Sequence, residues 1–71
     1  MKKYLFIIEE TAMGYSAFSP DLPGCVSAGH FREEVERNMR KAIELHLEGM
    51  WLEGLPAPDP HTYSACVDLA V

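Results

Sequence analysis

Clustered carboxylates are the first chemistry to consider in this sequence, because grouped Asp and Glu side chains can hold two divalent metal ions for nucleic-acid cleavage. Asp21 is the strongest candidate, and Glu9, Glu10 and Asp68 could supply further ligands. However, Glu9 and Glu10 close a predicted strand, and Asp68 lies on the more polar side of another. An Asp between two prolines typically caps its own turn. A structural role for Asp21 is therefore favoured, and a minimal metal-dependent nuclease is the less favoured alternative.

The histidines and cysteines lack the spacing of a catalytic or metal-binding motif. His46 lies on the apolar side of a predicted helix with no acid or nucleophile at helical spacing, which favours a core histidine over a catalytic base. His30 and His61 fall in predicted loops and are interpreted as surface residues. Cys25 and Cys66 have no CxxC spacing and no adjacent basic residue, so we expect small buried apolar residues. The sequence predicts no catalytic residue, no metal site and no cofactor.

The composition describes one small acidic domain over residues 1–71. A chain of 71 residues buries only ~60% of the surface that it exposes when unfolded, so its core is marginal. A net charge of −5 has the wrong sign for binding a phosphate backbone, which favours a basic protein partner over nucleic acid. No apolar run approaches the ~20 residues of a membrane span. With two cysteines and no disulfide pattern, we expect a cytoplasmic protein without a signal peptide or membrane anchor.

Three short strands are predicted before residue 30. Residues 2–10 carry apolar side chains on both faces, which is typical of a strand covered on both sides and places it centrally in the sheet. Met13-Gly14 marks a hairpin turn before a second strand at residues 15–19. Two prolines and a glycine make residues 20–24 a stiff connector. The third strand follows at residues 25–28.

The hydrophobic period changes from two to 3.6 residues over residues 32–52, which predicts a helix. Gly54 and three prolines end it. Trp51, outside the apolar stripe, is expected to pack under the loop of residues 56–60, with a partner interface as the alternative. Residues 63–71 then alternate as a fourth strand. The order βββαβ gives only one face of the sheet a helix, so something else should cover the other. The helical stripe that should face the sheet consists of Val35, Met39, Ala42, Ile43, His46 and Met50.

Several strings between residues 4 and 58 resemble the HicB-like family of bacterial antitoxins. These strings are Gly14-Tyr15-Ser16-Ala17, Pro20-Asp21-Leu22-Pro23-Gly24-Cys25, Gly29, Glu33-Glu34 and Ala42-Ile43-Glu44-Leu45. The resemblance implies an α+β, partial ribonuclease-H-like fold with sheet order 3-2-1-4 and one helix on one face. It also implies a non-enzymatic antitoxin that inhibits HicA, a small basic ribonuclease toxin that cleaves messenger RNA. Many relatives add a C-terminal DNA-binding module after the fourth strand, and none follows here, so operator binding is not expected.

Two interaction surfaces are predicted. By family analogy, the toxin-facing surface consists of Tyr15, Asp21, Leu22, Pro23, Gly24 and Cys25. The last strand has no Pro, Lys or inward charge to discourage pairing. We therefore expect a homo-oligomer, most simply a dimer, with an oligomer contact at Tyr63, Ala65, Val67 and Leu69. A stand-alone oligomeric module without a surviving toxin is the alternative.

Overall fold

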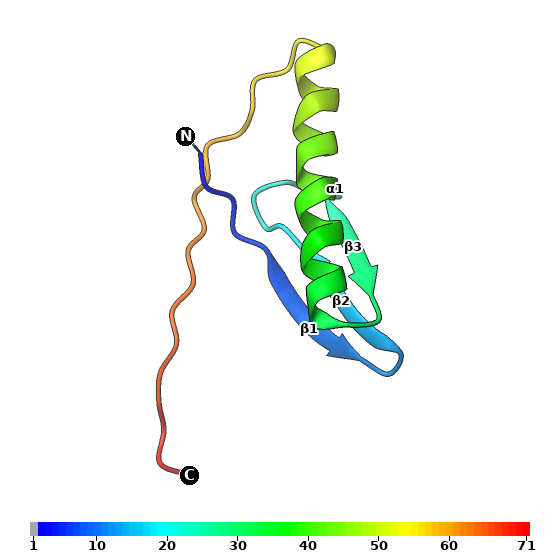
Figure 1. The fold of residues 1–71 in the computed structure, drawn as a ribbon. Coiled ribbons are helices and arrows are strands. Elements are labelled where there is room, and N and C mark those ends of the chain that lie inside the picture. Colours follow the sequence, from blue (N-terminus) through cyan, green and yellow to red (C-terminus); the bar gives the residue numbers. More distant parts are fainter. Residues whose placement is uncertain (1) are drawn as a thin grey trace.

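The computed structural model describes residues 2–71, which form a three-stranded antiparallel sheet with a helix across one face (Figure 1). The elements are β1 (Ile7–Thr11), β2 (Gly14–Phe18), β3 (Val26–Gly29) and α1 (Arg32–Leu52), and the sheet order is β1-β2-β3. The α+β class, the helix and the order of three strands are as predicted from the sequence, but the first strand begins at Ile7 and not at residue 2. Within the described residues, no helix is both long enough and apolar enough to cross a membrane.

The strand register sorts the side chains of the sheet into two faces. Ile8 pairs with Ala17, which is buried beneath α1. The neighbouring row joins Ile7, Phe18 and Val26 across all three strands. Because neighbouring positions along a strand alternate between faces, this row lies on the face opposite α1. Its three side chains are 38%, 38% and 64% exposed, so the uncovered face expected from the sequence exists.

The hydrophobic core lies between the sheet and the first half of α1. Its buried apolar residues are Ala17, Leu22, Cys25, Val35 and Met39. Partly buried side chains pack around them, among them Phe6 and Ile8 from the N-terminal part and Ala42, Ile43 and Leu47 from α1. The predicted stripe therefore does face the sheet. Its last two members, His46 and Met50, lie toward the C-terminal end of α1 and are only half-buried.

Both ends of α1 are set by local hydrogen bonds. At the start, Phe31 provides no side-chain cap, and the Glu34 carboxylate accepts a hydrogen bond from the His30 amide instead. At the end, Gly54 takes a φ of 74°, which allows the Leu55 amide to donate to the Met50 carbonyl at 2.9 Å. This is the glycine-dependent helix termination that the sequence predicts.

The expected packing of Trp51 under the proline-rich loop is wrong, because its side chain is 76% exposed. The proline-rich loop instead contacts the N-terminal segment, residues 2–6. Tyr4 Oη donates to the Pro58 carbonyl at 2.6 Å, and Lys2 Nζ donates to the Ala57 carbonyl at 3.0 Å. The loop therefore follows the N-terminal segment and leaves the last turn of α1 bare.

The predicted fourth strand does not form within residues 2–71. Residues 63–71, here called the C-terminal arm, run away from the domain in an extended path (Figure 1) and are exposed throughout. The radius of gyration, 13.9 Å, exceeds the ~11 Å of a compact 71-residue domain. The order 3-2-1-4 is therefore wrong in its last strand, and β1 is an edge strand rather than the central one. The alternation of apolar and polar residues makes the arm able to form a strand. A strand also needs the edge of another strand beside it to pair with.

Candidate protein-binding surface

The connector between β2 and β3, residues 19–25, is a closed loop. The Ser19 amide donates to the Cys25 carbonyl at 3.1 Å, and two further bonds join Leu22 to Ser19 and Cys25 to Leu22. Leu22 is fully buried and anchors the loop in the core. Gly24 has a φ of 83°, a conformation that side chains rarely adopt. Internal bonds, an apolar anchor and a required glycine together make this loop rigid.

The six residues of the predicted toxin-facing surface differ in accessibility. Pro23 and Gly24 are exposed, whereas Leu22 and Cys25 are buried and can only support the loop from below. Tyr15 is half-buried near the other end of β2, where it pairs with Glu10 and Gly29. Phe18, the residue before the loop, lies three positions along β2 from Tyr15, a distance of ~10 Å in a strand. The structure therefore places Tyr15 apart from the other five.

Asp21 binds a segment forty residues further along the chain. Its Oδ2 accepts hydrogen bonds from the amides of His61 and Thr62, both at 3.1 Å, and its Oδ1 accepts one from Thr62 Oγ1 at 2.9 Å. The expectation that Asp21 caps its own turn is wrong, because its side chain fixes the base of the C-terminal arm. Desolvation raises the pKa of this carboxyl, but the three hydrogen bonds and the nearby His61 outweigh it and hold the pKa below its usual value of 3.8.

The carboxylates weighed as metal ligands are not brought together. Among the residues that the structure describes, no group of three or more His, Cys, Asp and Glu side chains is arranged to hold a metal ion. Glu9 and Glu10 lie in β1, and Asp68 lies in the extended arm. Both carboxylate oxygens of Asp21 already accept hydrogen bonds. The alternative of a minimal nuclease gains no support from this arrangement.

The cysteines are free and occupy different environments. Cys25 is buried, as expected, and burial raises the pKa of its thiol. Cys66 is exposed in the C-terminal arm, so its predicted burial is wrong for the same reason that the fourth strand is wrong. Burial shields the Cys25 thiol, and neither cysteine has a basic residue next to it in the sequence.

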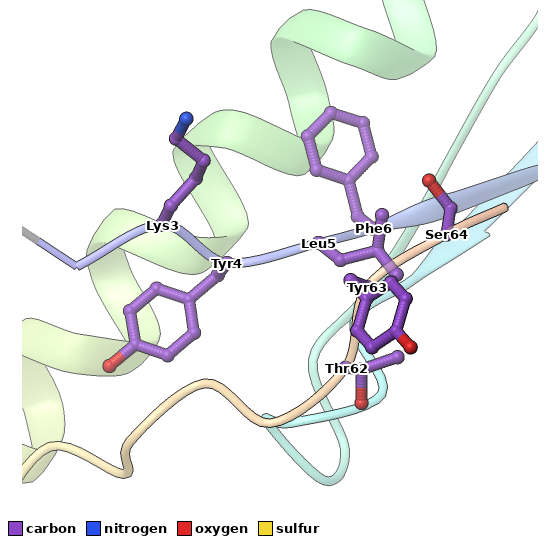
Figure 2. Close-up of a pocket in the computed structure, with 7 residues that line it drawn as sticks. All are labelled: Lys3, Tyr4, Leu5, Phe6, Thr62, Tyr63 and Ser64. Atoms are coloured by element: carbon purple, nitrogen blue, oxygen red, sulfur yellow. The ribbon is translucent and has the colours of Figure 1, made fainter.

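A cleft of about 440 Å³ separates the N-terminal segment from the start of the arm (Figure 2). Its walls are Lys3, Tyr4, Leu5, Phe6, Thr62, Tyr63 and Ser64. Leu5 and Tyr63 lie next to each other in this cleft (Figure 2). An ion pair between Lys2 and Asp59, at 3.0 Å, joins the N-terminal segment to the proline-rich loop and lowers the pKa of the Asp59 carboxyl. This cleft was not anticipated from the sequence, because it depends on contacts between the two ends of the chain.

Sequence and structure comparisons identify the family. A model described as the HicB-like antitoxin of bacterial toxin-antitoxin systems matches residues 4–68. The chain belongs to the HicB-like antitoxins. A solved structure of a HicA3 and HicB3 toxin-antitoxin complex contains a chain that superposes with a TM-score of 0.69 at 32% identity. The match covers 84% of this chain and 69% of that one.

Curated relatives of this HicB-like chain come from a phage and from bacteria. An uncharacterised 14.9 kDa protein of Haemophilus phage HP1 is 42% identical over 59 residues, which cover 80% of this chain and 44% of the relative. A UPF0150 protein of Helicobacter pylori is 54% identical over 41 residues, or 58% of this chain and 57% of the relative. A UPF0150 protein of Synechocystis is 43% identical over 56 residues, or 78% and 71%. The chain thus spans about half the length of the first two relatives.

Proposed function

We propose that this HicB-like domain is an antitoxin that binds and inhibits a HicA-like ribonuclease toxin. The observation that carries the proposal is the likeness, at 32% identity over 84% of this chain, to a chain from a HicA3 and HicB3 complex. Inhibition then consists of covering the surface with which the toxin handles RNA. The chain needs no catalytic group for this role.

Charge supports a basic partner of this kind. The net charge is −5, and the arm from residue 63 onward contributes only Asp68 to it. The strands and α1 together carry a charge of −3: Glu9 and Glu10, both exposed in β1, give −2, and the five acidic and four basic residues of α1 give −1. A basic toxin would be attracted to this part of the molecule, and such attraction raises association rates more than it sets affinity.

The loop of residues 19–25 offers a contact surface that internal hydrogen bonds and a buried leucine hold in shape. Pro23 and Gly24 stand exposed on it, and the buried Leu22 and Cys25 keep it in shape. A rigid loop loses little conformational freedom when it binds, so more of the contact energy appears as affinity. We assign direct toxin contacts to Pro23, Gly24 and, at the far end of β2, Tyr15. Asp21, Leu22 and Cys25 position that surface.

The decisive test is RNA cleavage by a HicA-like protein, to be sought in the reading frame beside the one that encodes this chain. The full chain should abolish cleavage at a stoichiometric ratio, and Pro23→Lys should raise the dissociation constant about tenfold or more, a loss of ~1.4 kcal/mol. Pro56→Lys is the matched control, because Pro56 is also an exposed proline but lies outside the assigned contact surface. Pro56→Lys should inhibit like the wild type.

Two results would count against this function. Unimpeded cleavage in the presence of excess wild-type chain would reject inhibition itself. Equal inhibition by the wild type and Pro23→Lys would leave inhibition standing but reject the assignment of the loop. If no basic protein is encoded beside the chain, the stand-alone oligomeric module becomes the better account.

A further inference from the structure

The C-terminal arm is a strand without a partner. Tyr63, Val67 and Leu69 are 86%, 76% and 71% exposed, although they alternate with more polar residues in the pattern of a half-buried strand. The only backbone hydrogen bond recorded within the arm joins the Val71 amide to the Leu69 carbonyl. Apolar side chains exposed to water are costly, and the arm's backbone groups, which have water rather than a strand as partner, form a template for pairing, so the arm is suited to joining an edge.

The sheet presents one edge that fits the arm. β1 pairs with β2 on one side only, which leaves its other side open. The extended N-terminal segment continues that edge back from Ile7 toward Lys3. Nine residues of arm span ~30 Å as a strand, enough to lie along the whole stretch from Lys3 to Thr11. Beside this edge, the row of Ile7, Phe18 and Val26 lacks any cover from α1.

The base of the arm is fixed, and its direction leads away from its own edge. Asp21 holds His61 and Thr62, and Tyr63 lies beside Leu5 in the cleft of Figure 2. Beyond Ser64 the arm diverges from β1 (Figure 1), and no strand pairing between the two is present. Each chain therefore presents one free strand and one free edge at the same time.

We propose that two copies of this chain exchange their C-terminal arms, each arm pairing with the β1 edge of the other copy around a two-fold axis. A second copy of the chain provides a partner for both the free arm and the free β1 edge. A different partner would pair with one of them and leave the other open. The charge pattern also favours it: Asp68 is the one charged residue of the arm, so the arm has little attraction for a basic toxin. The exchange buries Val67 and Leu69 and extends each sheet by one strand.

Sedimentation equilibrium on the full chain, from low to high micromolar concentration, tests the dimer. The wild type should sediment at twice its 8.0 kDa mass. The double variant Val67→Lys/Leu69→Lys should sediment as a monomer, because two ammonium groups would have to enter the apolar side of the new strand. Cys66→Lys/Ala70→Lys is the matched control, since it adds the same two charges to exposed positions on the opposite side of the arm and should leave the dimer intact.

Isotope-filtered NMR on a mixture of labelled and unlabelled copies locates the arm. We expect contacts between arm residues of one copy and residues 7–11 of the other. A mass of 8.0 kDa at all concentrations overturns the proposal, whether the arm closes on its own β1 or stays free. A dimer that survives Val67→Lys/Leu69→Lys, for example one joined through the exposed Trp51, also overturns it. This experiment requires no toxin, so its outcome is independent of the proposed function.

Discussion

Gly29 and Gly49 should respond in opposite directions to the same added methyl group. Gly29 ends β3 where the strand passes the start of α1, and a Cβ there would lie 2.7 Å from Val35 N and 3.0 Å from Val35 Cα. Both atoms belong to the backbone, so no side-chain rotation relieves the clash and the strand must move from the helix. Overpacking of this kind costs ~1–3 kcal/mol. Around Gly49, within α1, a Cβ would meet no atom within 4 Å, and alanine there should stabilise the helix by ~0.5–1 kcal/mol.

Urea unfolding at one fixed protein concentration measures both effects. At ~0.05–0.15 kcal/mol per residue, a domain of this size has a free energy of unfolding of ~4–11 kcal/mol, so Gly29→Ala removes a large share of it. With a slope of ~1 kcal/mol per molar urea, its midpoint should fall by ~1–3 M. The midpoint of Gly49→Ala should rise by up to ~1 M. If Gly29→Ala unfolds at the same midpoint as the wild type, β3 and α1 do not approach as closely as described.

Two further perturbations test the loop and the base of the arm. Leu22→Ala should lower the free energy of unfolding by ~2–5 kcal/mol, because Leu22 is fully buried. The control Leu45→Ala, at a position 59% exposed, should change the free energy of unfolding by less than ~0.5 kcal/mol. Urea unfolding midpoints of the two variants measure the difference. The lowered pKa of Asp21 means that its hydrogen bonds to the arm are fully present above pH 3.8 and are lost as the pH falls through the lowered value. Amide hydrogen exchange at Thr62, corrected for its intrinsic pH dependence, should therefore stay constant from pH 7 to 5 and accelerate only in stronger acid.

Sequence reasoning located the elements whose signals are local. The helix of residues 32–52 was predicted with the bounds that α1 has, because an apolar stripe defines its body and Gly54 with the following prolines ends it. The stiff connector was predicted from the same kind of evidence, since prolines and a glycine restrict the backbone wherever they occur. In these segments, the residues that decide the structure are neighbours in the sequence.

The incorrect predictions share a dependence on distant residues. Asp21 was expected to cap its own turn, but it binds Thr62, forty-one residues away. Trp51 was expected under the proline-rich loop, but Tyr4 draws that loop aside. Residues 63–71 alternate like a strand, yet alternation does not specify which edge they join. Each of these features depends on which segments of the chain meet in the folded structure. A periodic sequence pattern does not specify those contacts.

The two proposed interactions use different parts of the domain. Toxin attraction rests on the acidic sheet and helix and on the exposed loop residues Pro23 and Gly24, whereas self-association rests on an arm with Asp68 as its one charge. Asp21 is the physical link, because it precedes the buried anchor of the loop and also holds the base of the arm. Exchange at the β1 edge leaves the connection between β2 and β3 exposed in both copies, since that loop joins the other two strands. A dimer built in this way presents two copies of the loop proposed to contact the toxin, and under both proposals one copy need not release the other to bind a toxin.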